Sequence, residues 1–158
     1  MFATGIGYDV HCLVEGRPLV LGGVTFDYPL GLEGHSDADV LCHAIADAIL
    51  GAAGEPDIGH LFPNTDESIR GISSLEILRR VRAVLDERGH VLNTIDSTLI
   101  AEAPKIGPHL MAMKENIAGA LGLPPGHVGI KATTNEKLGF LGRGEGIAAM
   151  AVAAIERQ

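Results

Sequence analysis

The chain has 158 residues, of which 46% are hydrophobic and none is tryptophan, and its formal charge is −8. This length suffices for one core, so we expect residues 1–158 to form a single domain. The acidic charge argues against a nucleic-acid partner, which requires a basic surface. No run approaches the roughly 18 apolar residues of a membrane helix. The first residues also lack the pattern of a signal peptide, so we expect a cytoplasmic protein without a membrane partner.

The first predicted strand includes Ile6–His11 and carries two potential metal ligands. Asp9 and His11 are two residues apart, so strand alternation places them on one face. A third, His43, lies in the apolar run 40–46, which we interpret as a buried helix. One carboxylate and two imidazoles suit zinc and leave a fourth position open for water or substrate. For the spacing alone, an Asp–His hydrogen bond and an ordinary core histidine are the more common case.

Two cysteines adjoin the proposed histidine ligands, so they could be ligands themselves or could form a disulfide. Alternation turns Cys12 away from the face of His11, and Cys42 lies about 100° around the helix from His43. We therefore predict that both cysteines are small, buried hydrophobic residues.

The segment before the His43 helix resembles a capping box. Ser36 followed by Asp39 would start the helix there and turn its first amides toward whatever the metal holds. Asp47 follows His43 by four residues on the same helix face. Its carboxylate could orient the imidazole or could simply face solvent.

A long segment, Gly54–Asp66, has Gly and Pro near its ends and neither a helical nor a strand period. Long loops in compact domains often cover binding sites. We therefore expect a lid, with Asp57 and Asp66 as its polar contacts and His60 on the surface.

The remaining elements follow from apolar periodicity and turn residues. We predict a hairpin over residues 17–26 that turns at Gly22-Gly23. The later predictions are helices at Ser73–Arg88 and Pro108–Leu121 and strands at Val91–Ala103, His127–Thr133 and Ile147–Ile155.

Two segments in the second half carry further chemistry. Thr133, Thr134 and Glu136 form a cluster of hard oxygens that could hold Mg²⁺ against a diphosphate. A Pro-bounded turn at residues 104–108 could read a nucleobase edge through its backbone, with Lys105 near a phosphate. The simpler alternative for this turn is a strand-to-helix connection with proline at the first helical position.

Five motifs, in order, resemble the family of 2-C-methyl-D-erythritol 2,4-cyclodiphosphate synthases, and the resemblance runs essentially end to end. It implies an α/β (α+β) subunit with a mixed sheet covered by helices, ferredoxin-like in style, in a homotrimer with shared active sites. It also implies attack of a substrate 2-phosphate on the β-phosphorus of a cytidine diphosphate, with release of CMP, in the non-mevalonate isoprenoid pathway. The motifs are Asp9-Val10-His11 and residues 35–39, 57–63, 101–105 and 131–140.

The resemblance also implies residue roles. Asp9, His11 and His43 would bind one zinc ion per subunit. Asp47, placed by its helical spacing from His43 and not by the resemblance, would take a supporting position. Glu136 would hold a second cation, Mg²⁺ or Mn²⁺, which bridges the diphosphate. His35 and Thr134 would position phosphates. The other implied substrate-binding residues are Ser36, Asp57, Ile58, Gly59, Asp66, Ala101, Pro104, Lys105, Ile106, Thr133, Phe140 and Arg143.

The sequence departs from the family pattern at two positions. Asn64 stands where many members have an acid, and Met150 where some have a glutamate facing a central cavity of the trimer. If that cavity binds an isoprenoid diphosphate, Arg143 is available to it. The alternative functions are a metal-dependent phosphohydrolase and a non-enzymatic trimer that binds isoprenoid diphosphates.

Overall fold

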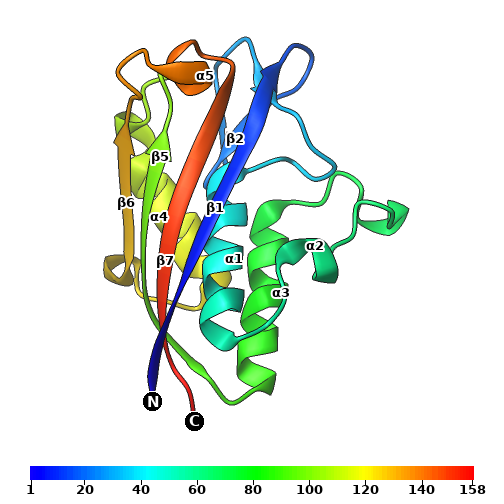
Figure 1. The fold of residues 1–158 in the computed structure, drawn as a ribbon, viewed down its shortest axis with the longest axis vertical. Coiled ribbons are helices and arrows are strands. Elements are labelled where there is room, and N and C mark those ends of the chain that lie inside the picture. Colours follow the sequence, from blue (N-terminus) through cyan, green and yellow to red (C-terminus); the bar gives the residue numbers. More distant parts are fainter.

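The computed structural model describes all 158 residues, which form a mixed sheet with helices (Figure 1). The sheet has the strand order β4-β1-β7-β5-β6. β7 pairs antiparallel with both β1 and β5, whereas β5 and β6 are parallel. The strands are β1 (Phe2–Val14), β4 (Gly31–Leu32), β5 (Val91–Ile100), β6 (Val128–Thr133) and β7 (Gly146–Glu156).

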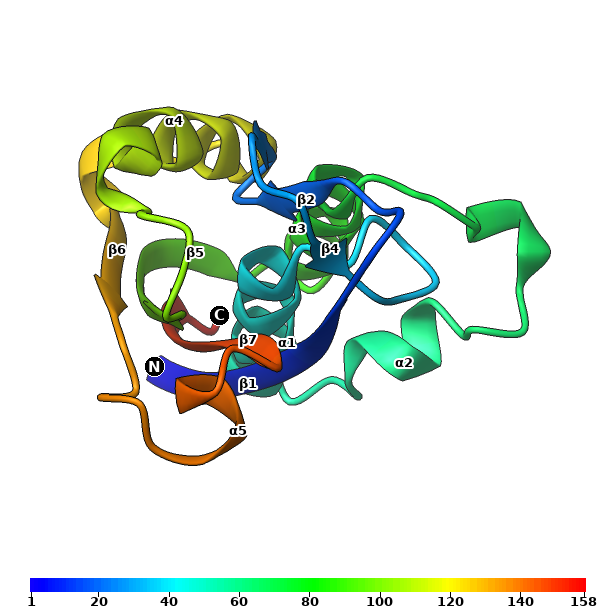
Figure 2. The same cartoon turned by 90° about the horizontal axis from the view of Figure 1, so that it is seen from above.

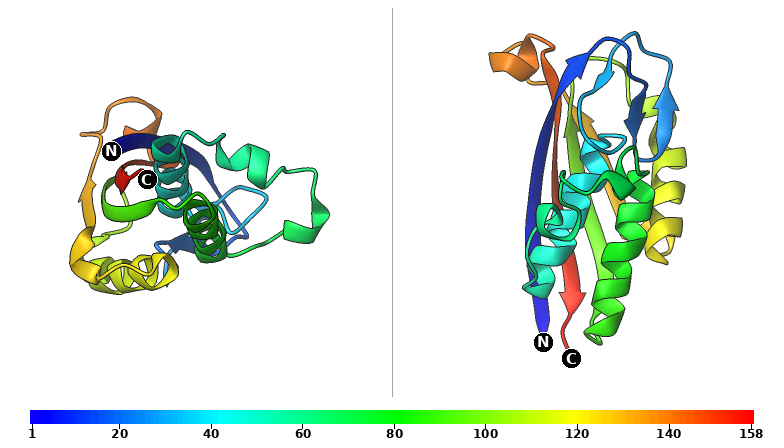
Figure 3. Two further views of the ribbon diagram at one scale, coloured as in Figure 1. Left: turned by 90° about the horizontal axis from the view of Figure 1, so that it is seen from below. Right: turned by 90° about the vertical axis from the view of Figure 1, so that its right-hand side faces the viewer.

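Three long helices cover one face of this sheet, and α1 packs directly on β1 and β7 (Figures 2 and 3). They are α1 (Val40–Ala53), α3 (Ser74–Glu87) and α4 (Leu110–Leu121). The opposite face has no helical layer. None of the helices is both long and apolar enough to span a membrane. The short helices are α2 (Ile58–Leu61) and α5 (Gly139–Gly142), with 3₁₀ turns at Glu67–Ile69, Gly107–His109 and Pro125–His127.

The mixed α+β architecture is confirmed, but the ferredoxin-like connectivity is wrong. A ferredoxin-like chain runs β-α-β-β-α-β. Here two long helices, α1 and α3, separate β1 from β5, α4 connects β5 to β6, and the chain then turns back into β7, so its main elements run β-α-α-β-α-β-β. The parallel pair of β5 and β6 follows from this crossover, because parallel neighbours need a long connection.

The hairpin of β2 (Leu19–Leu21) and β3 (Val24–Phe26) is confirmed, with Gly22 and Gly23 both at positive φ. The buried carboxylate of Asp39 accepts hydrogen bonds from the amides of Gly22 and Gly23 at 3.0 and 2.8 Å. It also accepts one from the amide of Cys42 at 3.2 Å, which caps α1. Burial, together with the charge of Asp37, raises the pKa of Asp39. Asp39 therefore fastens the hairpin to the start of α1.

The predicted capping box at Ser36 is wrong. The left-handed conformation of Ala38, with φ of 57°, interrupts any helix that starts at Ser36, so α1 begins at Val40 with Asp39 as its N-cap. Because the Asp39 carboxylate already occupies this helix end, the first amides of α1 do not face a ligand of the metal as expected.

Close packing of α1 on β1 depends on two glycines of the strand. A Cβ atom at Gly7 would lie 1.8 Å from the carbonyl oxygen of Ala44, and one at Gly5 would lie 2.1 Å from that of Ala48. Any side chain here would push the helix from the strand. The glycines therefore set the distance between His43 on α1 and the ligands on β1.

We expect Gly7→Ala to lower the free energy of unfolding by about 3 kcal/mol or more, since the obstacle is backbone rather than a movable side chain. Urea denaturation measures this change. The matched control is Gly119→Ala on the exposed side of α4, where a Cβ meets nothing within 4 Å. That change should be neutral or stabilising by up to about 1 kcal/mol. Equal stabilities of the two variants would contradict the close-packing argument.

Candidate active site

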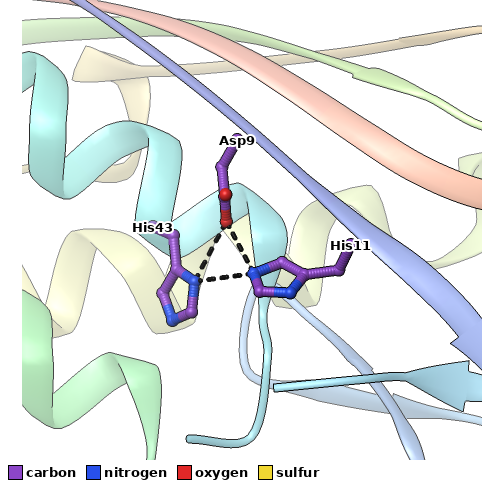
Figure 4. Close-up of side chains that lie close together, drawn as sticks. All are labelled: Asp9, His11 and His43. Carbon is purple, nitrogen blue, oxygen red and sulfur yellow. Dashed lines mark hydrogen bonds and ion pairs between the residues drawn. The ribbon is translucent and has the colours of Figure 1, made fainter. Parts of the chain in front are cut away.

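Asp9, His11 and His43 converge between β1 and α1, as predicted (Figure 4). The Asp9 Oδ2 atom lies 2.8 Å from His11 Nε2 and 3.0 Å from His43 Nδ1. The two ring nitrogens are 3.2 Å apart. No other group of three or more His, Cys, Asp or Glu side chains in the chain comes together in this way.

The outer nitrogen of each imidazole has its own partner. His11 Nδ1 donates to the carbonyl oxygen of Glu33 at 2.6 Å, so Nε2, the nitrogen beside Asp9, is the atom that would bind a cation. His43 Nε2 lies 3.0 Å from the hydroxyls of both Ser36 and Ser74, so its Nδ1 is the ligating atom. Two oriented imidazoles and one carboxylate fit a divalent cation such as zinc.

The charges at the site are coupled. Burial alone would raise the pKa of Asp9, but hydrogen bonds from His11 and His43, together with their charges, lower it to about 2. Burial acts to lower the pKa of His11, and the hydrogen bond and charge of Asp9 outweigh it and raise that pKa. Asp9 is therefore an anion at neutral pH, and a bound cation would replace the protons that the three side chains share.

A cavity opens beside these ligands and includes four of the predicted substrate-binding residues: His35, Ser36, Ile58 and Gly59. Asn64 also lines it. Three protein ligands beside an open cavity are the arrangement of a catalytic metal centre, because structural zinc centres are closed by four protein ligands.

The predicted lid is only partly irregular, because α2 and a 3₁₀ turn lie within and just after it. Asp57 caps α2 and accepts from the amide of His60, while Asp66 caps the 3₁₀ turn and accepts from Ser68. Both carboxylates are exposed, and neither lines the cavity. His60 is exposed, as expected. The closing motion of this segment stays a prediction.

Asp47 neither orients His43 nor faces solvent freely. Its Oδ1 accepts a hydrogen bond from the amide of Ile58 at 2.9 Å, and burial raises its pKa. The predicted supporting role is wrong because the outer nitrogen of His43 turns to Ser36 and Ser74. Asp47 instead joins α1 to the start of α2, beside the cavity.

A second cavity gathers the predicted nucleotide residues. Its lining includes Ala101, Pro104, Lys105, Ile106, Thr133, Thr134 and Glu136. Thr134 Oγ1 lies 3.3 Å from Glu136 Oε1, so these oxygens do form a cluster. Phe140 and Arg143 lie outside this cavity on and just after α5, and Arg143 pairs with Glu145 at 2.7 Å.

Glu102 organises the loop beside this second cavity, a role that was not predicted from the sequence. Its Oε1 accepts from the amides of Asn135 and Lys137 at 3.2 and 2.9 Å. Glu136 and Lys137 are both at positive φ, which non-glycine residues adopt rarely. The carboxylate therefore stabilises the unusual turn that presents Thr134 and Glu136.

The cavity beside Asp9, His11 and His43 and the cavity of the predicted nucleotide residues share no lining residue. Asp9, His11 and His43 lie between β1 and α1, whereas the nucleotide residues lie at the ends of β5 and β6. The chain therefore presents two separate cavities, one with each set of residues.

The cysteines differ from each other. Cys42 is buried, as predicted, and its thiol donates to Asp39 at 3.3 Å. Burial and the nearby charge of Asp39 raise its pKa. Cys12 is exposed, so the prediction that it is buried is wrong, because its strand face is not covered by a helix. Both thiols are free.

These features define an α+β domain with a candidate metal site, Asp9, His11 and His43, beside an open cavity, and the comparisons specify the family. A model of the YgbB family matches residues 2–156. The chain belongs to this family.

Relatives that match over nearly their full length agree with this family assignment. The 2-C-methyl-D-erythritol 2,4-cyclodiphosphate synthase of Akkermansia muciniphila is 60% identical over 153 residues, which cover 96% of this chain and 90% of the relative. That of Synechococcus elongatus is 54% identical over 156 residues, covering 99% and 98%. A solved 2C-methyl-D-erythritol-2,4-cyclodiphosphate synthase in a CDP-bound form has a TM-score of 0.88 at 37% identity, covering 97% of this chain and 99% of its own.

Proposed function

We propose that this chain catalyses the reaction of its relatives, the formation of 2-C-methyl-D-erythritol 2,4-cyclodiphosphate with release of CMP. The observation that carries this assignment is 54% to 60% identity over nearly the full length of relatives that bear this name. The converging side chains of Asp9, His11 and His43 support it. The substrate is 4-diphosphocytidyl-2-C-methyl-D-erythritol 2-phosphate, an intermediate of isoprenoid synthesis.

The protein needs to supply orientation rather than a nucleophile. The attacking 2-phosphate is already an anion and is tethered in the same substrate molecule, so a correctly held substrate has a large advantage over free reactants. Asp9, His11 and His43 would hold zinc, which supplies Lewis-acid polarisation of a phosphate oxygen. His35 and Ser36, in the adjoining cavity, would hold the phosphates in line with each other.

The second half-site would hold the leaving group. Thr133, Thr134 and Glu136 offer hard oxygens for the α-phosphate and for Mg²⁺ or Mn²⁺. The backbone of residues 101–106 would hold the cytosine and ribose, with Lys105 near the phosphates. CMP would then leave as a bound, charge-neutralised group.

We further propose that the chain assembles as a homotrimer. The helix-free face of the sheet exposes large apolar side chains, including Ile6, Tyr8, Met150 and Val152. A monomer seldom exposes such a group of apolar side chains without a partner. Assembly would cover them and bring the metal half-site of one subunit to the nucleotide half-site of the next. A central cavity near Arg143 could then take an isoprenoid diphosphate, with Met150 in its lining.

Phosphorus NMR of the products tests the assignment. The protein is incubated with its cytidine diphosphate substrate and Mg²⁺, and the expected products are a cyclic diphosphate and CMP in equal amounts. A sample without protein is the control. An opened phosphate ester would instead show a phosphohydrolase, and unchanged substrate would favour a non-enzymatic binding protein.

A further inference from the structure

We propose that Ser74 is a positioning residue that, together with Asp37, fixes His43 in its metal-binding tautomer. The inference rests on the proposed metal site and adds to it a relay of two side chains behind one ligand. Neither Ser74 nor Asp37 lines the cavity beside Asp9, His11 and His43.

The relay begins with the placement of Ser74. It is the first residue of α3, it is fully buried, and its hydroxyl lies 3.0 Å from His43 Nε2. The same hydroxyl donates to the Asp37 carboxylate. Ser74 therefore bridges a carboxylate and the outer nitrogen of a metal ligand.

The direction of the protons follows from the donors available. Asp37 accepts from the Ser74 amide at 2.9 Å, from the Asp39 amide at 3.1 Å and from the Ser74 hydroxyl. All three donors point at the two carboxylate oxygens of Asp37, so the side chain acts here as an acceptor. The Ser74 hydroxyl proton therefore points to Asp37, and its lone pairs face His43. His43 must then carry its proton on Nε2, which leaves the Nδ1 lone pair for the metal.

The backbone explains why this geometry is rigid. Ser73 is the N-cap of α3, yet its side chain makes no capping hydrogen bond. Asp37 fills that role from another segment of the chain through its bond to the Ser74 amide. One carboxylate thus caps α3 and orients the Ser74 hydroxyl, so the position of His43 is tied to both helices.

The relay also frees a second hydroxyl. Ser36 Oγ lies 3.0 Å from His43 Nε2 and accepts from the Ala38 amide at 3.0 Å. In this arrangement the single proton on His43 Nε2 is donated to Ser74 Oγ. The Ser36 hydroxyl can then donate into the cavity that it lines, which is the chemistry a phosphate oxygen requires.

The test measures zinc affinity by competition with a chromophoric chelator. Ser74→Ala should weaken zinc binding by roughly 10- to 100-fold, the usual cost of losing a hydrogen-bond partner behind a metal ligand. The matched control is Ser73→Ala, one residue away, exposed and without a side-chain bond, which should leave the affinity unchanged. Asp37→Asn keeps the shape and one acceptor oxygen but loses the charge, so it should give a smaller loss in the same direction.

Thermal unfolding of the metal-free variants separates this role from a general loss of structure. If Ser74→Ala does not fold, Asp37→Asn decides the question. Wild-type affinity in a folded Ser74→Ala, or in Asp37→Asn when Ser74→Ala fails to fold, would overturn the relay but leave the metal site standing. A wild-type protein that binds no zinc would instead overturn the metal site itself.

Discussion

His43→Ala should lower kcat by roughly 10³-fold or more, because a metal contributes several kcal/mol to charge stabilisation and each 1.36 kcal/mol changes the rate about tenfold. With only two side chains left, Asp9 and His11 cannot form a three-ligand site. The fold should survive, because a catalytic metal contributes less to folding than a structural one. CMP release, zinc content and circular dichroism measure the three parts of this prediction.

His60→Ala is the control for His43→Ala. His60 is exposed on α2 and pairs only with the neighbouring exposed Asp57, so the variant should keep its zinc and its activity. Full activity of a chelator-treated, metal-free wild-type protein would contradict a catalytic metal at Asp9, His11 and His43.

Mixing two inactive variants should restore activity if the half-sites of neighbouring subunits combine. His43→Ala damages only the metal half-site, and the double variant Thr134→Ala, Glu136→Ala damages only the nucleotide half-site. In a ring of three, each mixed trimer has one junction where an intact metal half-site meets an intact nucleotide half-site. Random co-refolding at equal amounts makes about three-quarters of the rings mixed, so roughly one-quarter of the sites should recover.

The unmixed variants, refolded separately and then combined without subunit exchange, are the control and should stay inactive. Activity that remains near zero after co-refolding, in mixed rings verified by mass spectrometry, would mean that each site is built within one subunit. The separation of the two cavities in this subunit would then need another explanation, such as a large movement of the loop before α5.

The ligand set could be predicted from sequence because each signal is local. Asp9 and His11 share a face by strand alternation, and His43 stands out as a polar residue in an apolar helix. The helices α3 and α4 and the hairpin were likewise predicted to within a few residues, whereas α2 and α5 were not predicted. The full length of β1 was not, since Gly5 and Gly7 weaken its strand pattern although they are the residues on which α1 packs.

The partners of the ligands could not be predicted in this way because they come from distant segments. Ser74 looks like an ordinary first residue of a helix, and Asp37 like one more acid before α1. Only the packing of α3 against α1 joins them to His43. Asp47 was assigned a role that it does not have. Its helical spacing from His43 was correct, but its carboxylate accepts from the amide of Ile58, which the sequence does not reveal.

The pairing of β1 with β7 has a consequence for the biosynthesis of the protein. β1 is paired with β7 from Phe2 opposite Glu156 to Cys12 opposite Gly146, whereas β4 pairs only with Leu13 and Val14. Asp9 and His11 therefore have no neighbouring strand until β7 has been synthesised. The strand that carries these two side chains is thus the first of the sheet to be made and, along most of its length, one of the last to be paired.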